Sequence, residues 1–261
     1  MKKTLKAFHL TSALLLISGT TVSVRAQYSP PTAGLVAWWR AEGNANDSAD
    51  SHNGTLQGGM GFTPGVFGQA FAAGSNKRVY VPDSPAFQLT SLTMAAWANP
   101  SGPGYTILFR GDDRSGLDPY HMGMDPNNGR FAFELADGSG GYDILETPNA
   151  MALNQWAHYA VTLDNATHDM RIYLNGVLSA EKTTTVTPLL ALDPGEVPGI
   201  GIGNVQDFYD FPFQGGIDEV VLYNRALSPA EVVTLVPEPS CATLICCGLT
   251  ALFLSRRLRG E

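Results

Sequence analysis

The chain has 261 residues, of which 44% are hydrophobic and only 15% are charged, so it can bury a sizeable core. Its 28 glycines and 17 prolines break it into short alternating runs, which argues against a helical or α/β protein of this length. Between residues 27 and 236, nine basic and 22 acidic residues give a net charge of −13, against −8 for the whole chain. Nucleic acids and other polyanions are therefore not expected as partners.

Residues 1–26 have the three parts of a secretory signal peptide. Three lysines precede an apolar stretch from Leu10 to Ile17, and the short side chains of Val24 and Ala26 follow it. The apolar stretch is too short to span a bilayer, and the lysines hold its start on the cytoplasmic side. The pattern predicts export with cleavage after Ala26, which leaves a domain of residues 27–236.

Residues 237–261 also have three parts. Pro237, Glu238 and Pro239 are followed by 14 apolar residues, 241–254, and then by a basic cluster within 256–259. The basic residues of this cluster are Arg256, Arg257 and Arg259. The prolines keep their segment extended, the apolar residues enter the membrane, and the arginines stay on the cytoplasmic side. A run of 14 is short for a permanent span, so the tail predicts transient insertion into the inner membrane, with a single-span tail anchor as the alternative.

This ordered tail resembles the PEP-CTERM sorting signal. The resemblance implies that an exosortase, a membrane cysteine transpeptidase, recognises Pro237, Glu238 and Pro239 and then releases or transfers the chain. Proteins with this signal are typical of Gram-negative bacteria that secrete exopolysaccharide. The resemblance therefore implies a membrane-tethered intermediate and a final place on the cell surface or in the extracellular matrix.

Strand-like runs bounded by turn residues recur between the two ends. They occupy 34–40, 78–81, 92–98, 105–109, 130–135, 142–145, 156–163, 170–174, 177–180 and 213–223. Asn175 and Gly176 tolerate the positive φ angles of a two-residue type I′ turn, which predicts a β-hairpin. Ser228, Pro229 and Glu231 form a capping box that predicts one short helix. Many strands, one helical turn and no βαβ alternation predict an all-β fold of two sheets.

Four segments of the domain follow one another in an order found in a known family. They are 34–39 with 42–48, 92–97, 156–162 with 173–176, and 216–220 with 224–228. Their order resembles that of laminin G-like domains, which share the concanavalin A-like lectin/glucanase fold. The resemblance implies an antiparallel jelly-roll sandwich from Gly34 to about Leu235, used for carbohydrate or protein recognition in a family of varied functions.

The sequence carries no catalytic signature, so no enzyme activity is predicted. Glucanases of this fold have Glu-x-Asp-x-x-Glu on one strand, a spacing that is absent here. Asp218 and Glu219 are adjacent, and neighbouring strand residues point to opposite faces unless a bulge intervenes. The histidines show no ligand spacing, and all three cysteines lie in the C-terminal tail. Gly199–Gly203 predicts a strand with one bare face rather than a nucleotide-binding loop.

Carboxylate and amide oxygens crowd the segment from Glu42 to Asn53, which does not match the EF-hand pattern. Related lectin/glucanase domains often hold a structural Ca²⁺ where the first and last strands meet. The resemblance thus implies Asp47 and Asp218 as calcium ligands, with Glu42 as a further one. The alternative is that Asp47 and Asp218 cap turns.

Aromatic residues in expected loops are candidates for stacking against sugar rings. The tryptophans, by contrast, sit in alternating apolar runs, which places Trp38 or Trp39, Trp97 and Trp156 in the core. The loop candidates are Tyr105, Tyr120, Phe208, Tyr209 and Phe211. We therefore predict a non-catalytic carbohydrate-binding module with an extracellular polysaccharide as partner. A purely structural matrix protein and a glycoside hydrolase of the same fold are the alternatives.

Overall fold

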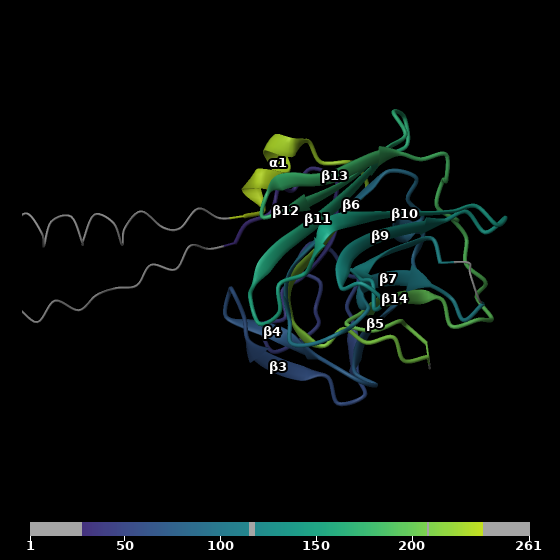
Figure 1. Cartoon of the computed structure of the whole chain (residues 1–261). Coiled ribbons are helices and arrows are strands. Elements are labelled where there is room, and N and C mark those ends of the chain that lie inside the picture. Colours follow the sequence, from purple (N-terminus) through teal and green to yellow (C-terminus); the bar gives the residue numbers. More distant parts are fainter. Residues whose placement is uncertain (1–27, 115–117, 208, 237–261) are drawn as a thin grey trace, which may run out of the picture. The chain divides into compact units, whose positions relative to one another are not determined.

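The computed structural model describes residues 28–114, 118–207 and 209–236 (Figure 1). The predicted signal peptide 1–26, Phe208 and the predicted sorting segment 237–261, with its Pro-Glu-Pro motif and arginine cluster, lie outside the described residues. Across the described ranges the chain forms 15 strands, one 3-10 helix and one α-helix, which confirms the all-β prediction. No helix in this described part is long and apolar enough to cross a membrane.

One sheet contains eight strands and brings the first and last strands of the domain together. Its order is β13-β12-β11-β6-β15-β4-β3, with β1 paired to β15. The bounds are β13 (Val177–Thr183), β12 (Asp169–Leu174), β11 (Ala157–Asp164), β6 (Leu92–Pro100), β15 (Gly215–Tyr223), β4 (Gln69–Ala73), β3 (Gly61–Pro64) and β1 (Leu35–Trp39). All of these strands pair antiparallel, and Trp38 of β1 is opposite Val221 of β15.

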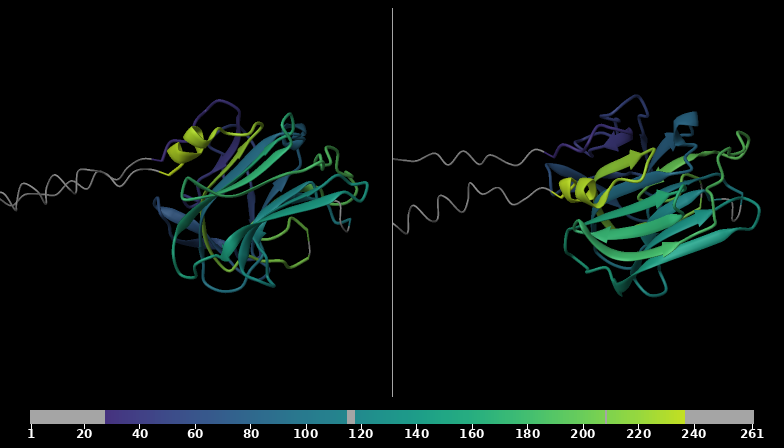
Figure 2. Two further views of the ribbon diagram at one scale, coloured as in Figure 1. Left: turned by 45° about the horizontal axis from the view of Figure 1, so that its top comes forward. Right: turned by 90° about the horizontal axis from the view of Figure 1, so that it is seen from above.

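The other sheet contains seven strands, also antiparallel, in the order β10-β9-β8-β7-β14-β5-β2. The bounds are β10 (Tyr142–Ala150), β9 (Arg130–Ala136), β8 (Tyr120–Met124), β7 (Thr106–Gly111), β14 (Gly199–Ile202), β5 (Arg78–Pro82) and β2 (Thr55–Gln57). The short helix η1 (Pro85–Phe87) follows β5. Figures 1 and 2 show the two sheets layered face to face, which is the predicted sandwich.

The core between the sheets is built from alternate residues of each strand. Phe131 of β9 stacks on Tyr159 of β11 with ring centroids 4.6 Å apart, so a ring pair joins the two sheets. Trp39 is fully buried, as predicted. The core prediction for Trp97 and Trp156 is wrong: both are half-buried outside the central core. Alternation on β6 turns the alanines on either side of Trp97 inward and the indole outward.

Two local predictions are confirmed. Asn175 and Gly176 join β12 to β13 with φ angles of 49° and 78°. Helix α1 (Pro229–Thr234) opens on a capping box in which Ser228 Oγ accepts from Glu231 N and the Glu231 carboxylate accepts from Ser228 N. Strands β2, β3, β4 and β8 were not predicted. They are short, or their Gly and His residues interrupt the alternation of polar and apolar residues that identifies a strand.

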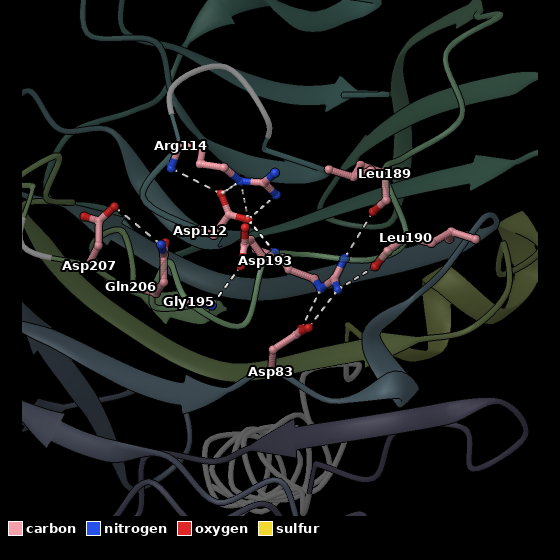
Figure 3. Close-up of polar contacts among 10 residues, drawn as sticks. Asp83, Asp112, Arg114, Leu189, Leu190, Asp193, Gly195, Gln206 and Asp207 are labelled. Atoms are coloured by element: carbon pink, nitrogen blue, oxygen red, sulfur yellow. Dashed lines mark hydrogen bonds and ion pairs between the residues drawn. The ribbon is translucent and has the colours of Figure 1, made fainter. Parts of the chain in front are cut away.

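The long connection from β13 to β14 is held in place by Arg110, which is fully buried on β7. Its Nε and Nη2 donate to the Asp83 carboxylate at 2.9 and 3.1 Å, and its Nη1 and Nη2 donate to the carbonyls of Leu189 and Leu190 at 3.2 and 2.8 Å. Figure 3 shows these acceptors converging from two segments far apart in sequence. One guanidinium therefore fixes this connection against the sheet.

Replacing Arg110 should destabilise the domain strongly. Arg110→Met leaves the Asp83 carboxylate and two carbonyls without their donor, and we expect a loss of about 3 kcal/mol in the free energy of unfolding, measured by urea denaturation. The control is Arg171→Ala, which removes a partly exposed ion pair with Asp169 and Glu181 and should cost less than about 1 kcal/mol. Equal losses in both variants would contradict the anchoring role of Arg110.

Candidate functional site

A cavity of about 630 Å³ lies on the seven-stranded sheet, on the face turned away from the core. On β7, β8 and β9 the inward residues Leu108, Met122 and Phe133 are fully buried in the core. Their neighbours Phe109, His121 and Glu134 point to the opposite face and are register partners across the three strands, so they form one continuous row. All three residues of this row line the cavity.

Glu134 is the central polar group of this row. Tyr105 donates its hydroxyl to both carboxylate oxygens of Glu134, at 3.0 and 3.2 Å. Burial by itself favours the neutral acid, but the neighbouring His121 and the hydroxyl groups of Tyr105 and Tyr142 outweigh it and lower the pKa of Glu134. Glu134 is therefore a fixed carboxylate at neutral pH. Burial and this carboxylate also raise the pKa of Tyr105, which keeps its hydroxyl a donor.

His121 lies beside Glu134 with hydrogen-bonding capacity to spare. Its side chain is only 2% exposed, and its Nδ1 is 3.4 Å from Glu134 Oε1, close enough for an ion pair but without hydrogen-bond geometry. Its Nε2 also lacks a hydrogen-bond partner. The ring packs against Tyr105 at a centroid distance of 4.4 Å and against the edge of Phe109 at 5.9 Å. The imidazole is thus a buried polar group in the cavity wall, held by the Glu134 ion pair and by two aromatic rings.

An aromatic wall continues from Tyr105 along the segment before β15. The rings of Tyr105 and Phe211 meet edge to face at 5.9 Å, and Phe211 lies 6.4 Å from Tyr209. Tyr209 and Phe211 are each about half exposed, at 50% and 51%. A sugar ring has an apolar CH face and polar edges, so ring faces next to a carboxylate and an imidazole match its two kinds of surface.

This wall is held by the bare face of β14. A Cβ on Gly201 would come within 2.2 Å of the Asn204 carbonyl, so only glycine lets the following loop pack on the strand. Asn204 in turn donates to Asp210 at 2.6 Å and accepts from the Phe211 amide at 2.8 Å. The predicted strand with a side-chain-free face is confirmed, and its glycines position the loop that carries Phe211.

Five further carboxyl groups line the cavity. They belong to Asp112, Asp113, Asp118, Asp125 and Asp207. Asp112 pairs with Arg114 at 2.5 Å and accepts from the Asp193 amide at 3.0 Å; Figure 3 shows this cluster beside Asp207. Burial raises the pKa of Asp118 to about 7 and also raises that of Asp207. Arg114 is the one Lys or Arg among the described residues of the lining.

A second carboxylate cluster lies where β1 meets β15. A bulge between Asp218 and Val221, with Glu219 at a φ of 51°, overrides the usual alternation, and Asp218 and Glu219 are both fully buried. Asp218 accepts from the Phe67 amide at 3.0 Å, and Glu219 accepts from the indole of Trp38. One oxygen of each carboxyl group has no hydrogen-bond partner. Burial raises the pKa of Asp218 to about 7 and that of Glu219 to about 8.

The three predicted calcium ligands fall into two groups. The turn at 65–68 contacts both Glu42 and Asp218, because a Cβ on Gly68 or Gly65 would lie within 2.5 Å of the respective carboxylate. Asp47 instead accepts from the amides of Trp38, Ala49, Asp50 and His52 at 2.8 to 3.3 Å, which is the turn-capping arrangement. Within the described ranges no three His, Cys, Asp or Glu side chains converge as a metal site.

Residues 73–233, more than half of the chain, match the family described as the Concanavalin A-like lectin/glucanases superfamily. The chain belongs to this family. A comparison with curated proteins found no match. As a member of the concanavalin A-like family, the chain has a lectin-like fold that glycoside hydrolases and non-catalytic binding domains share.

Solved structures have the same fold at low sequence identity. Domain 4 of AbnA, a GH43 extracellular arabinanase from Geobacillus stearothermophilus, in complex with arabinotriose, has a TM-score of 0.64 and 22% identity, covering 78% of this chain and 98% of that domain. The binding domain of Paraclostridial Mosquitocidal Protein 1 gives 0.62 and 15%, covering 78% and 52%. The binding domain of Botulinum Neurotoxin DC in complex with SialylT gives 0.57 and 15%, covering 78% and 51%. The chain thus spans about half of the toxin binding domains.

The structure brings three of the five predicted aromatic candidates together at the cavity, namely Tyr105, Tyr209 and Phe211. The surface prediction for Tyr120 is wrong. Tyr120 lies on β8 facing the core, is fully buried, and donates to the Phe87 carbonyl at 3.0 Å. Phe208 lies outside the described residues. Sequence reasoning missed His121 and Glu134, although a charged Glu134 between the apolar Phe133 and Leu135 is a recognisable sign of a strand face turned away from the core.

Proposed function

We propose that this domain binds an extracellular glycan, without cleaving it, in the cavity on the seven-stranded sheet. The observation that carries the proposal is the Tyr105, His121 and Glu134 arrangement, in which the Tyr105 ring packs on the His121 imidazole and its hydroxyl holds a fixed carboxylate at the cavity. These groups project from paired strands and from the residue that enters β7, so the site is preorganised. Phe211 extends the ring surface towards solvent.

Two similar folds support a glycan as the ligand. Domain 4 of AbnA is in complex with arabinotriose, and the binding domain of Botulinum Neurotoxin DC is in complex with SialylT. Both belong to proteins that are only distantly related to this chain, at 22% and 15% identity. They support a carbohydrate partner as a class, and the cavity chemistry must supply the specificity.

Glycoside hydrolysis is the second candidate function. Asp118 and Glu134 line one cavity with pKa values moved in opposite directions, which is the electrostatic arrangement of an acid and its partner carboxylate. Against this, Tyr105 donates to both oxygens of Glu134, which weakens that carboxylate as a nucleophile or base. We therefore propose binding rather than hydrolysis. Release of reducing sugar from a bound glycan would establish the hydrolase instead.

We further propose that the chain is exported and sorted by an exosortase to the cell surface or the extracellular matrix. The proposal rests on the lysine-led apolar N-terminus and on Pro237, Glu238 and Pro239 ahead of an apolar stretch and arginines. The tail would be a transient membrane anchor whose arginines stay on the cytoplasmic side.

For the calcium expectation we propose a site at Glu42 and Asp218, with Asp47 as a turn cap. The unpaired, buried oxygen of Asp218 and the shared 65–68 turn favour a cation there, since Ca²⁺ would neutralise carboxyl groups that burial otherwise protonates. The remaining ligands would be backbone oxygens or water, as is common for Ca²⁺.

Removing an aromatic ring should weaken glycan binding. Phe211→Ala is expected to lower the affinity for a glycan selected on an array by about tenfold, because the ring contributes contact area at the cavity mouth. Isothermal titration calorimetry measures the change, and Val177→Ala, an exposed apolar residue on β13 of the other sheet, is the matched control. A purely structural matrix protein would bind nothing on the array, which would contradict the proposal.

Replacing the Pro-Glu-Pro motif should stop processing. With Pro237, Glu238 and Pro239 all changed to Ala, we expect the chain to accumulate in the membrane fraction, because the exosortase no longer recognises it. Mass spectrometry of the extracellular wild-type chain should show that Arg256 to Arg259 are missing. An extracellular chain that retains those arginines would refute the sorting route.

Calcium should raise thermal stability. We expect 1 mM Ca²⁺ to increase the melting temperature of the EGTA-treated protein by about 5 °C or more. Asp218→Asn should abolish the increase, whereas Asp47→Asn should lower the melting temperature but keep the calcium response. An unchanged melting curve on adding Ca²⁺ would end the calcium proposal.

A further inference from the structure

The charge of the cavity distinguishes between classes of glycan. Its lining combines Glu134 with five aspartates, and Arg114, the one Lys or Arg among the described lining residues, is already paired with Asp112 at 2.5 Å. A predominantly acidic cavity wall raises the local concentration of cationic ligands and disfavours anionic ones. Uronic acids and other carboxylated sugars would therefore meet repulsion here.

Resting on the proposed glycan-binding function, we infer that the preferred ligand of this cavity is an amino sugar with free amines, such as a glucosamine-containing polysaccharide. Glu134 is held by Tyr105 at 3.0 and 3.2 Å, so a carboxylate stands ready for an ammonium group without reorganisation. The rings of Tyr105 and the half-exposed Phe211 lie at the same cavity, and an ammonium over an exposed aromatic face gains further attraction.

His121 adds a buried polar group to the acidic lining of the cavity. Its side chain is 98% buried, lines the cavity and leaves Nε2 without a hydrogen-bond partner. Because this nitrogen is itself buried, the ligand contacts must come from the carboxylates and the aromatic rings, and a lone metal ion or a simple organic cation would leave the ring face of Phe211 uncovered. The site therefore matches a ligand that has an ammonium group and an apolar ring face on one unit.

The test compares three oligosaccharides of equal length on the full protein: a glucosamine oligomer, its N-acetylated form and a galacturonic acid oligomer. We expect the free amine form to bind at least about tenfold more tightly than the acetylated form, and the acid form to bind weakest. The amine preference should shrink as salt rises from about 20 mM to about 300 mM, because screening weakens charge attraction.

Glu134→Gln tests the residue itself, since glutamine keeps the size of the side chain and still accepts from Tyr105. It should reduce the ratio of amine to acetylated affinity by about tenfold. The matched control Glu181→Gln, an exposed carboxylate on β13 of the other sheet, should leave the ratio unchanged.

The outcomes separate the two proposals. Equal or tighter binding of the acetylated or acidic oligomer by the wild-type protein would overturn the amino-sugar inference while supporting glycan binding. Binding of no glycan on a broad array would overturn both. If Glu134→Gln does not fold, the salt series and the three-ligand comparison on the wild-type protein still decide the inference.

Discussion

The site depends on the two-residue alternation of β7, β8 and β9. Leu108, Met122 and Phe133 pack in the core. Their neighbours Phe109 and His121 therefore lie on the opposite face of the sheet. A slip of one residue would exchange the two sets and place an imidazole and a carboxylate in an apolar core, at a large free-energy cost. The hydrophobic core therefore specifies the polar row, and the cavity takes its geometry from the packing behind it.

On β15 a bulge interrupts the two-residue alternation, and this interruption costs stability. The bulge at Asp218 and Glu219 needs a positive φ at a non-glycine residue, and it leaves one buried Asp218 oxygen without a hydrogen-bond partner and one Glu219 oxygen with only the Arg40 guanidinium at 3.9 Å. Two such groups near the first strand would destabilise an otherwise apolar sandwich. A bound cation would offset this cost, and the proposed calcium site rests on this argument.

Local sequence signals predicted local structure well here, whereas contacts between distant segments could not be predicted. The Asn175-Gly176 hairpin, the Ser228 capping box and the bare strand at Gly199–Ile202 each depend on a few adjacent residues. Strand β8 was missed because its outward residues, His121 and Gly123, hide the alternation, and this error also misplaced Tyr120. The contact of Phe67 with Asp218 spans 151 residues, and no pattern within one segment can reveal it.

The glycines of β14 connect the fold to the binding surface. Gly201 lets the Asn204 backbone pack directly on the strand, and Asn204 then holds the Phe211 amide at 2.8 Å. Phe211 reaches Tyr105, which in turn holds Glu134. A side chain at Gly201 would push this loop outward and separate the ring wall from the carboxylate without touching either. The recognition surface therefore depends on Gly201, a residue without a side chain. Although glycine usually weakens a strand, Gly201 sets the distance between the aromatic wall and Glu134.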